Sequence, residues 1–207
     1  MRLLSGLSIL LATCACTAGS TGLDLGEPTP AGWREIATSN DRSRLRSWRT
    51  AWVEALAKAK AAGHQEEIEK EGALLDPDAA LTDPIPPAGN YACRVIKMGA
   101  KGQGGVDYIA YPTFNCRISA EATRLSFAKL NGSQRPIGFI LPDTNRRAIF
   151  LGTMQLGDER RSLEYGEDRD RDMAGVVERI GPQRWRIEFP YPHFESTADV
   201  FELVPRN

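Results

Sequence analysis

The chain has 207 residues, of which 26 are Lys or Arg and 27 are Asp or Glu, so its formal net charge is −1. This length suits one ordinary domain with an appendage. The acids and bases are interspersed and nearly cancel, which argues against nucleic acid as a partner, because nucleic acid requires a basic patch.

Residues 1–16 have the pattern of an export signal. Arg2 precedes an apolar run over residues 3–12, and small residues follow it. The run is shorter than the roughly twenty residues of a membrane-spanning helix, so it indicates a secretory signal. The small residues before Cys16 resemble a bacterial lipobox, which predicts Cys16 as the lipidated residue and Cys14 as the alternative. An ordinary signal peptide cut near Ala18 would instead leave a soluble periplasmic protein.

Lipidation at Cys16 would attach the protein to a membrane, because each buried methylene of an acyl chain contributes about 0.8 kcal/mol. Thr17, and not Asp, follows this cysteine, which in a Gram-negative envelope indicates the outer membrane. We therefore expect an exported periplasmic protein that is anchored to the outer membrane. Residues 17–32 are rich in Gly, Thr, Pro and Ser, and this composition predicts a flexible tether.

Residues 33–76 have the pattern of a helical hairpin. Apolar side chains recur at spacings of three and four, at Leu45, Trp48, Trp52, Leu56 and Ala59. This spacing predicts an amphipathic helix from about Asn40, capped by Ser39 or by Asn40 itself and ended by Gly63. A second, shorter helix is expected over residues 64–75, because acids in its first turns suit the helix dipole. We expect the apolar face of the hairpin to pack on the domain that follows.

A proline-rich linker over residues 77–89 leads into a segment with strand periodicity, residues 90–207. Alternating patterns occupy residues 91–98, 106–111, 114–118, 124–130, 136–141, 147–155, 174–180, 185–189 and 198–204. The pair Asn131-Gly132 is a strong hairpin signal, and residues 157–172 form a long charged loop. About eight short strands without βαβ alternation predict an antiparallel barrel or sandwich. The expected fold class is α+β, an N-terminal helical hairpin followed by a small antiparallel β-barrel.

Two of the four cysteines remain after the export signal, Cys93 and Cys116. An even pair in an exported protein predicts a disulfide, which would contribute about 3 kcal/mol by closing a loop of this length. The alternative is a metal-ligating or catalytic pair. It has neither a neighbouring histidine nor Cys-x-x-Cys spacing to support it.

Motifs for cofactors and metals are weak. The glycines of residues 99–105 are followed by a strand pattern, whereas a dinucleotide loop needs a helix there. The acids of residues 168–172 alternate as in a calcium loop, but Met173 and Arg179 occupy the positions that require Gly and a bidentate acid. We therefore expect no cofactor and no metal site.

Catalytic signatures are also weak. His64 and His193 are the only histidines, so a three-histidine zinc site cannot form. The chain has no Gly-x-Ser-x-Gly elbow. A hydrolase that uses two carboxylates or a free thiol remains open, although the balance of motifs favours a protein without catalytic activity.

Some residues are candidates for a binding surface. Arginine beside an aromatic ring suits an anionic group, because its planar fork binds in two places. The candidates are Arg94, Tyr108, Tyr111 and Trp185, together with the loop acids Asp168, Asp170 and Asp172. The alternative is structural: the strand arginines, among them Arg186, would then lie on a solvated sheet face and the aromatic residues in the core.

Five segments carry a family resemblance: PAGNYACRVIKMG (residues 87–99), KLNGSQRP (129–136), MAGVVERIG (173–181), RWR (184–186) and ELVP (202–205). Together they resemble an uncharacterised family, domain of unknown function 4893, found in sphingomonad-type alphaproteobacteria. The likeness covers roughly residues 33–205. It implies a Gram-negative envelope and brings no activity or site residues. More loosely, Gly89-x-Tyr91 is similar to the Gly-x-Trp motif that opens lipocalins and small periplasmic inhibitor barrels, which remains an analogy.

Three functions are compatible with these features. The favoured one is a non-enzymatic binding module of the envelope that recognises a partner protein as an inhibitor does, with residues 157–172 as contact surface. The second is a carrier of a small apolar or lipid ligand inside the barrel. A carrier would need small residues to face inward, namely Ala92, Ala110, Ala128, Gly138 and Gly152. The third is an envelope hydrolase.

Overall fold

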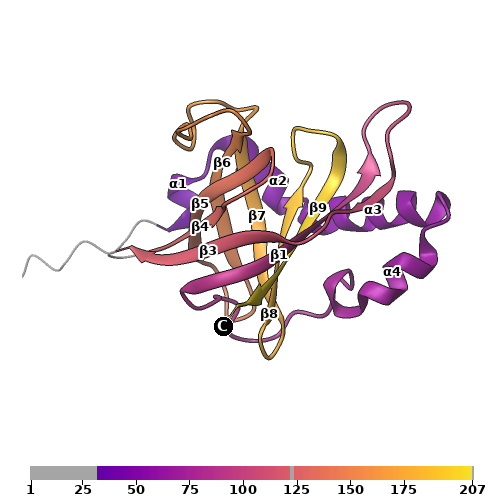
Figure 1. Cartoon of the computed structure of the whole chain (residues 1–207), viewed down its shortest axis with the longest axis horizontal. Helices are drawn as coiled ribbons and strands as arrows, with labels where there is room; N and C mark the ends of the chain where they lie inside the picture. Colours follow the sequence, from indigo (N-terminus) through magenta and orange to yellow (C-terminus); the bar gives the residue numbers. More distant parts are fainter. Residues whose placement is uncertain (1–31, 122–123, 207) are drawn as a thin grey trace, which may run out of the picture.

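The computed structural model describes residues 32–121 and 124–206. The expected export signal, with Cys14 and Cys16, and the tether up to residue 31 lie outside these described residues. A layer of helices is followed by a closed antiparallel barrel, which confirms the expected fold class (Figure 1).

The helices come first in the chain. They are α1 (Trp33–Ile36), α2 (Ser39–Arg46), α3 (Trp48–Ala61), α4 (Gln65–Glu71) and the 3-10 helix η1 (Gly72–Leu74). The strands are β1 (Gly89–Ala100), β2 (Tyr108–Ala110), β3 (Phe114–Glu121), β4 (Arg124–Lys129), β5 (Gln134–Pro142), β6 (Ala148–Leu156), β7 (Asp172–Gly181), β8 (Arg184–Pro190) and β9 (Ser196–Pro205). No described helix is long and apolar enough to cross a membrane.

The barrel follows the chain from strand to strand. Each strand from β3 to β9 pairs antiparallel with the next, and β9 pairs with β1 to close the sheet. Strand β1 pairs with β3 through its first half and with β2 through its second half, so β2 and β3 share one position around the barrel. The break between them contains Pro112, which has no N–H for a strand ladder. The closed barrel therefore has eight strand positions.

The barrel interior is filled by its own side chains. Four phenylalanines form a chain of edge-to-face contacts, with ring centroids 5.8, 5.4 and 5.2 Å apart: Phe127, Phe150, Phe189 and Phe201. Such contacts add to the energy of burying the rings. The strand alternation predicted from the sequence produces this core, because every second side chain faces inward.

The small residues that a lumen carrier needs do not form a cavity inside the barrel, and Ala110 is exposed. Ala92 and Ala128 face outward, since their neighbours Cys93 and Phe127 are in the core. Gly138 and Gly152 lie opposite each other, and a Cβ atom on either would come within 2.3 Å of the backbone of the facing strand. These two glycines let β5 and β6 approach closely, and a Cβ on Gly152 would also meet the ring of Phe150 at 2.6 Å.

The disulfide between Cys93 and Cys116 is present and joins β1 to β3, with the two Cα atoms 5.9 Å apart. Both residues are buried in the barrel core. The sequence prediction of this pairing is confirmed.

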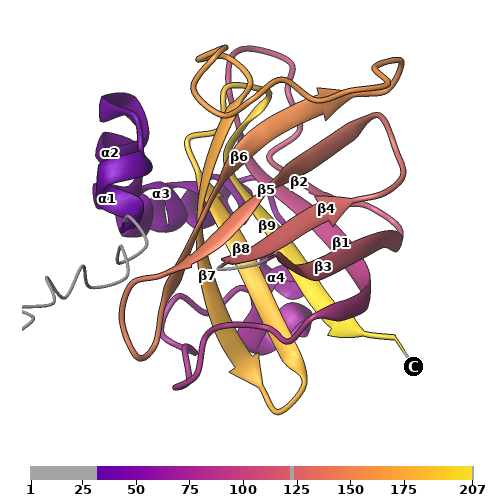
Figure 2. The same cartoon turned by 90° about the vertical axis from the view of Figure 1, so that its left-hand side faces the viewer.

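The helices lie along one side of the barrel wall (Figures 1 and 2). The prediction of one long helix from about Asn40 to Gly63 is wrong in one respect, because the segment is divided at Ser47 into α2 and α3. The cap was also misplaced by one residue: the Thr38 hydroxyl accepts the Asp41 N–H at 3.2 Å. Gly63 ends the segment as predicted, with a left-handed φ of 96°. The second predicted helix stops early, since Gly72 adopts a φ of 55° after α4.

Arg186 corrects the expectation of a solvated arginine face. Its side chain is fully buried between β8 and the helical layer, and its guanidinium lies 4.4 Å from the ring centroid of Trp52. It pairs with Glu178 at 2.7 Å. The sequence shows only that Arg186 faces outward; the helices that cover this part of the wall decide that it is buried.

Candidate binding site at the barrel mouth

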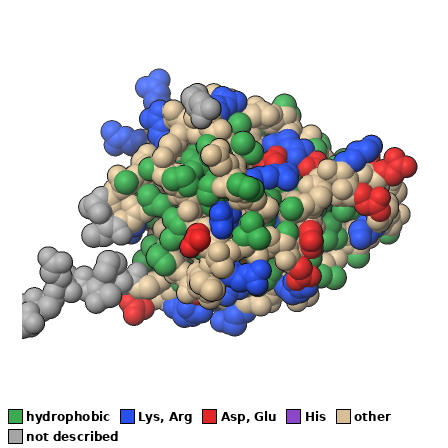
Figure 3. All heavy atoms as spheres, turned by 90° about the horizontal axis from the view of Figure 1, so that it is seen from below, with side chains coloured by type: hydrophobic (Ala, Val, Ile, Leu, Met, Phe, Trp, Pro, Cys, Tyr) green, Lys and Arg blue, Asp and Glu red, His purple; other side chains and the backbone are tan. Residues whose placement is uncertain are grey.

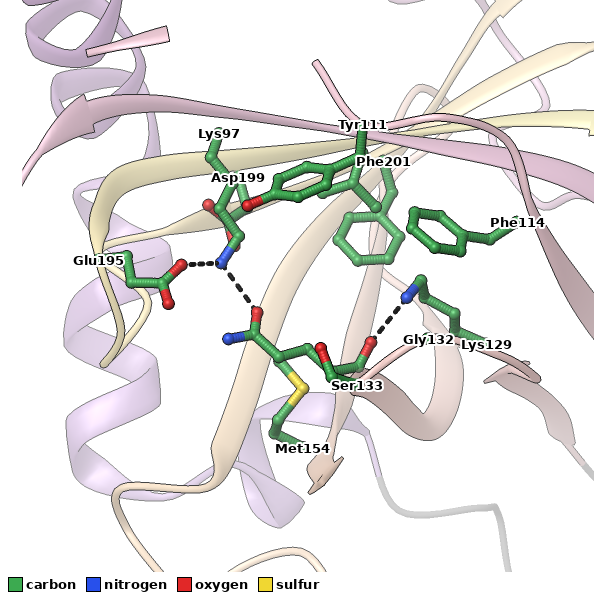
Figure 4. A pocket seen from close by; sticks show the side chains of 12 residues that line it. Lys97, Tyr111, Phe114, Lys129, Gly132, Ser133, Met154, Glu195, Asp199 and Phe201 are labelled. Carbon is green, nitrogen blue, oxygen red and sulfur yellow. Dashed lines mark hydrogen bonds and ion pairs between the residues drawn. The ribbon is translucent and has the colours of Figure 1, made fainter. Parts of the chain in front are cut away.

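One end of the barrel contains a hollow of about 270 Å³, which we call the mouth hollow. It lies where the β4–β5 turn and the β8–β9 loop meet the break between β2 and β3 (Figure 4). Its polar side chains are Lys97, Lys129, Gln134, Glu195 and Asp199, and its apolar side chains include Tyr111, Phe114, Met154 and Phe201. Side chains from several strands and two connections therefore converge on one place.

Lys97 of β1 connects the start of β5 with the β8–β9 loop. Its Nζ donates to Gln134 Oε1 at 2.8 Å and to Glu195 Oε2 at 2.7 Å (Figure 4). Asp199 Oδ2 lies 3.9 Å from the same nitrogen. Burial disfavours the charge on Lys97, but Asp199 and Glu195 outweigh it and raise the lysine pKa above its usual value. The ammonium of Lys97 is thus compensated by carboxylates.

Asp199 lies at the inner side of this network and is buried. Burial raises its pKa to about 6, against the opposing effects of Lys97 and of the Ser196 hydroxyl, which donates to the carboxylate. This carboxyl group therefore titrates close to neutral pH.

Lys129 differs from Lys97 in its partners. Its Nζ donates to the backbone oxygens of Asn131 at 3.0 Å and Gln134 at 2.8 Å, and it lies 3.7 Å from the ring centroid of Phe114. Within the described residues, no carboxylate forms an ion pair with it. Burial, with smaller effects of Arg135 and Lys97, lowers its pKa to about 8. The mouth hollow therefore has one lysine without a compensating anion.

The turn predicted at Asn131-Gly132 shapes this part of the site. Gly132 adopts a left-handed φ of 87°. A Cβ atom there would lie 2.7 Å from Lys129 Nζ and 3.1 Å from the ring of Phe114. Any other residue would displace the ammonium or the ring, so glycine is required for the turn and for the site.

Only Tyr111 of the predicted binding residues lines the mouth hollow. Its hydroxyl points toward Lys97 and Asp199 (Figure 4). Tyr108 packs outside the barrel, stacked on His64 at 5.2 Å between ring centroids. Trp185 lies in the barrel core. Arg94 pairs with Glu71 and Glu202 on the outer wall.

The loop acids predicted as a contact surface are engaged mainly within their own loop. Asp168 Oδ1 accepts the Asp170 N–H at 2.9 Å, and Asp172 Oδ1 accepts the Gly166 N–H at 2.8 Å. Asp170 approaches His193, with 3.5 Å between Oδ1 and Nδ1. Within residues 32–121 and 124–206, no three His, Cys, Asp or Glu side chains are grouped so that they could hold a metal ion.

The sequence interpretation missed Lys97, Lys129, Glu195 and Asp199. Strand parity contained a signal for the two lysines, because Lys97 shares a strand face with inward-facing Val95, and Lys129 shares one with inward-facing Phe127. A lysine at an inward position of a barrel strand is costly unless it lies at an open end. The convergence of the four residues depends on closure of the barrel, which no local pattern shows.

The model of the family described as Domain of unknown function (DUF4893) matches residues 33–203. The chain belongs to this family. The DUF4893 match begins at α1 and ends in β9, so it includes the helices as well as the barrel. Searches of the curated proteins and of the solved structures found no match. The DUF4893 description carries no activity, so the function has to be inferred from the site.

Proposed function

We propose that this protein is a non-enzymatic binding module of the bacterial cell envelope and that its mouth hollow receives the bound molecule. The observation that carries the proposal is the mouth hollow itself, in which an uncompensated lysine faces aromatic side chains. Concave sites with apolar walls and a few converging polar groups are the usual form of ligand sites.

The packing of the barrel limits where a ligand can bind. The chain of phenylalanines occupies the lumen, and Tyr91, Trp185 and Met154 fill space beside it. A carrier that encloses a lipid deep inside the barrel is therefore disfavoured. The mouth hollow is smaller than most sites for drug-sized ligands, so it suits a small molecule.

The disulfide counts against the form of the hydrolase hypothesis that uses a free thiol. Cys93 and Cys116 are joined in the barrel core, so neither thiol is free to act as a nucleophile. Of the mouth carboxylates, Glu195 is paired with Lys97. These contacts favour binding over catalysis.

The partner-protein hypothesis has support from one further feature. The β6–β7 connection is held in place, because Arg135 donates to the backbone oxygens of Leu156 at 2.7 Å and Glu159 at 3.1 Å. Exposed Leu163 in this connection lines a groove of about 670 Å³ along the outer face of β4, β5 and β6, with Ile137 and Phe139. A partner protein would bind at this groove, whereas a small ligand would bind at the mouth.

Native mass spectrometry of the protein, purified from envelope in mild detergent, tests the proposal. We expect an additional small mass that is lost on denaturation and that is absent when Gly132→Val blocks the mouth hollow. Gly166→Val is the control for a left-handed glycine, because a Cβ atom there meets no neighbour. A bare polypeptide in every sample would contradict small-molecule binding, and a co-purifying protein lost on Leu163→Asp would favour the groove.

A further inference from the structure

The two lysines of the mouth hollow differ in whether a carboxylate compensates their positive charge. Lys97 has Glu195 at 2.7 Å and Asp199 at 3.9 Å. Lys129 is equally enclosed but contacts two backbone oxygens and a ring face. A backbone oxygen carries only a partial negative charge, so the full charge of Lys129 is left for an anion to neutralise.

The walls of the mouth hollow next to Lys129 are aromatic and apolar. Phe114 lies over the ammonium, Phe201 lies beside Phe114, and Tyr111 follows toward Lys97 (Figure 4). Met154 closes the opposite side with a polarisable thioether, which packs well against aromatic rings. A flat apolar group is therefore accommodated within a few ångströms of a positive charge.

We infer that the mouth hollow binds a small aromatic carboxylate, with the carboxylate beside Lys129 and the ring packed among Phe114, Phe201 and Met154. This inference rests on the proposed function and specifies its ligand class. A volume of about 270 Å³ accommodates a single ring with a short substituent and excludes a long acyl chain.

The charged groups of the mouth set the pH range for such a ligand. Lys129 has a pKa of about 8, and a bound carboxylate would raise it. Lys97, Glu195 and Asp199 face the same space, and protonation of Asp199 near its pKa of about 6 removes a negative charge from it. Carboxylate binding is therefore strongest at slightly acidic pH and weakens as the pH rises through the pKa of Lys129.

The test compares three probes that share one ring. Benzoate, benzyl alcohol and benzylamine are titrated into the full-length protein, and amide shifts in the NMR spectrum report the affinity and the place of binding. The variant Lys129→Gln removes the charge but keeps an N–H donor for the turn oxygens. Lys70→Gln on exposed helix α4 is the matched control.

Benzoate should shift amides of the β4–β5 turn and the β8–β9 loop and should bind about tenfold to a hundredfold more tightly than benzyl alcohol, as expected for a hydrogen bond to a charged group. Lys129→Gln should abolish this preference and leave benzyl alcohol binding unchanged, which also shows that the variant is folded. Lys70→Gln should behave as the wild type.

Two results would overturn the inference and leave different conclusions. If benzyl alcohol or benzylamine binds the mouth as tightly as benzoate, the carboxylate class is wrong while the mouth remains a binding site. If none of the probes shifts mouth amides at millimolar concentration, the ligand class is wrong, and the proposed function then depends on the mass measurement of the envelope protein.

Discussion

At the scale of single residues, Glu188 is the most unusual side chain outside the mouth hollow. It faces outward from β8 between Val176 and Val200, beneath the helical layer, and is fully buried. Neither carboxylate oxygen has a hydrogen-bond partner within the described residues. Burial, reinforced by the nearby charge of Glu178, raises the pKa of this carboxyl group well above its usual value.

Glu188 is expected to make the stability of the protein depend on pH. Because its pKa is higher in the folded chain, protonation favours folding; this contribution is complete below the unfolded pKa of about 4.3 and is lost as the pH rises through the folded pKa. Glu188→Gln keeps the shape without the titration. Urea unfolding should show that the variant gains stability over the wild type as the pH rises from about 4 toward neutral, by about 1.4 kcal/mol for each unit of pKa difference.

Exposed Glu66 on α4 provides the control for this measurement. Glu66→Gln should follow the wild-type pH profile. Parallel profiles for Glu188→Gln and the wild type would show that Glu188 has no elevated pKa in the folded chain.

At the scale of elements, Arg186 connects the barrel wall to the helical layer. Its guanidinium donates to the backbone oxygens of Ala73 at 2.8 Å and Asp76 at 2.6 Å, in and just after η1. Its second partner is the buried carboxylate of Glu178, at 2.7 Å. One side chain therefore satisfies backbone groups at the end of the helices and a charge on β7.

Removal of Arg186 should loosen this connection. Arg186→Met leaves the Glu178 carboxylate buried without its partner, which typically costs about 3–5 kcal/mol. We expect a loss of that order in the free energy of unfolding, with faster amide exchange at residues 72–76. The comparison is Arg184→Met on the same strand: Arg184 pairs with Glu202 in a partly exposed position, where ion pairs contribute about 0–1 kcal/mol. Equal effects of the two substitutions would refute the special role of Arg186.

At the scale of the whole molecule, the helices and the barrel act as one unit. Trp52, Ala55 and Ala59 of α3 pack on Ile96 and Val200 of the wall. Acidic and basic side chains are interspersed on the face seen in Figure 3, in keeping with the net charge of −1. A face of mixed charge does not steer a highly charged partner strongly, so recognition there is expected to depend on local sites.

We expect the position of the molecule in the cell to depend on lipidation of Cys16. We expect the wild type to carry an acyl mass at Cys16 and to sediment with membranes, whereas Cys16→Ser should be released into the soluble periplasmic fraction without this mass. Cys14→Ser should keep the anchor. Mass spectrometry of the N-terminal peptide decides between the two cysteines, and an unmodified wild-type N-terminus beginning near Ala18 would support the ordinary signal peptide.

Features that depend on local periodicity could be predicted from the amino-acid sequence. Alternation of apolar residues predicted the strands, and Asn131-Gly132 predicted its turn, because each of these signals lies within a short stretch of chain. The disulfide was predicted from the number of cysteines, since Cys93 and Cys116 form an even pair. The sequence also showed which side chains share a face of a strand. It did not show what covers that face.

Which outward residues are buried and which inward residues meet depends on how the helices and strands pack together. Arg186 and Glu188 point to the outer face of their strand, where side chains are usually solvated. The helical layer covers this face and buries them. Lys97 and Asp199 lie far apart in the chain, and closure of the barrel by β1 and β9 places them opposite each other at one mouth. These outcomes depend on contacts between distant segments, and a contact between distant segments leaves no periodic signal in either one.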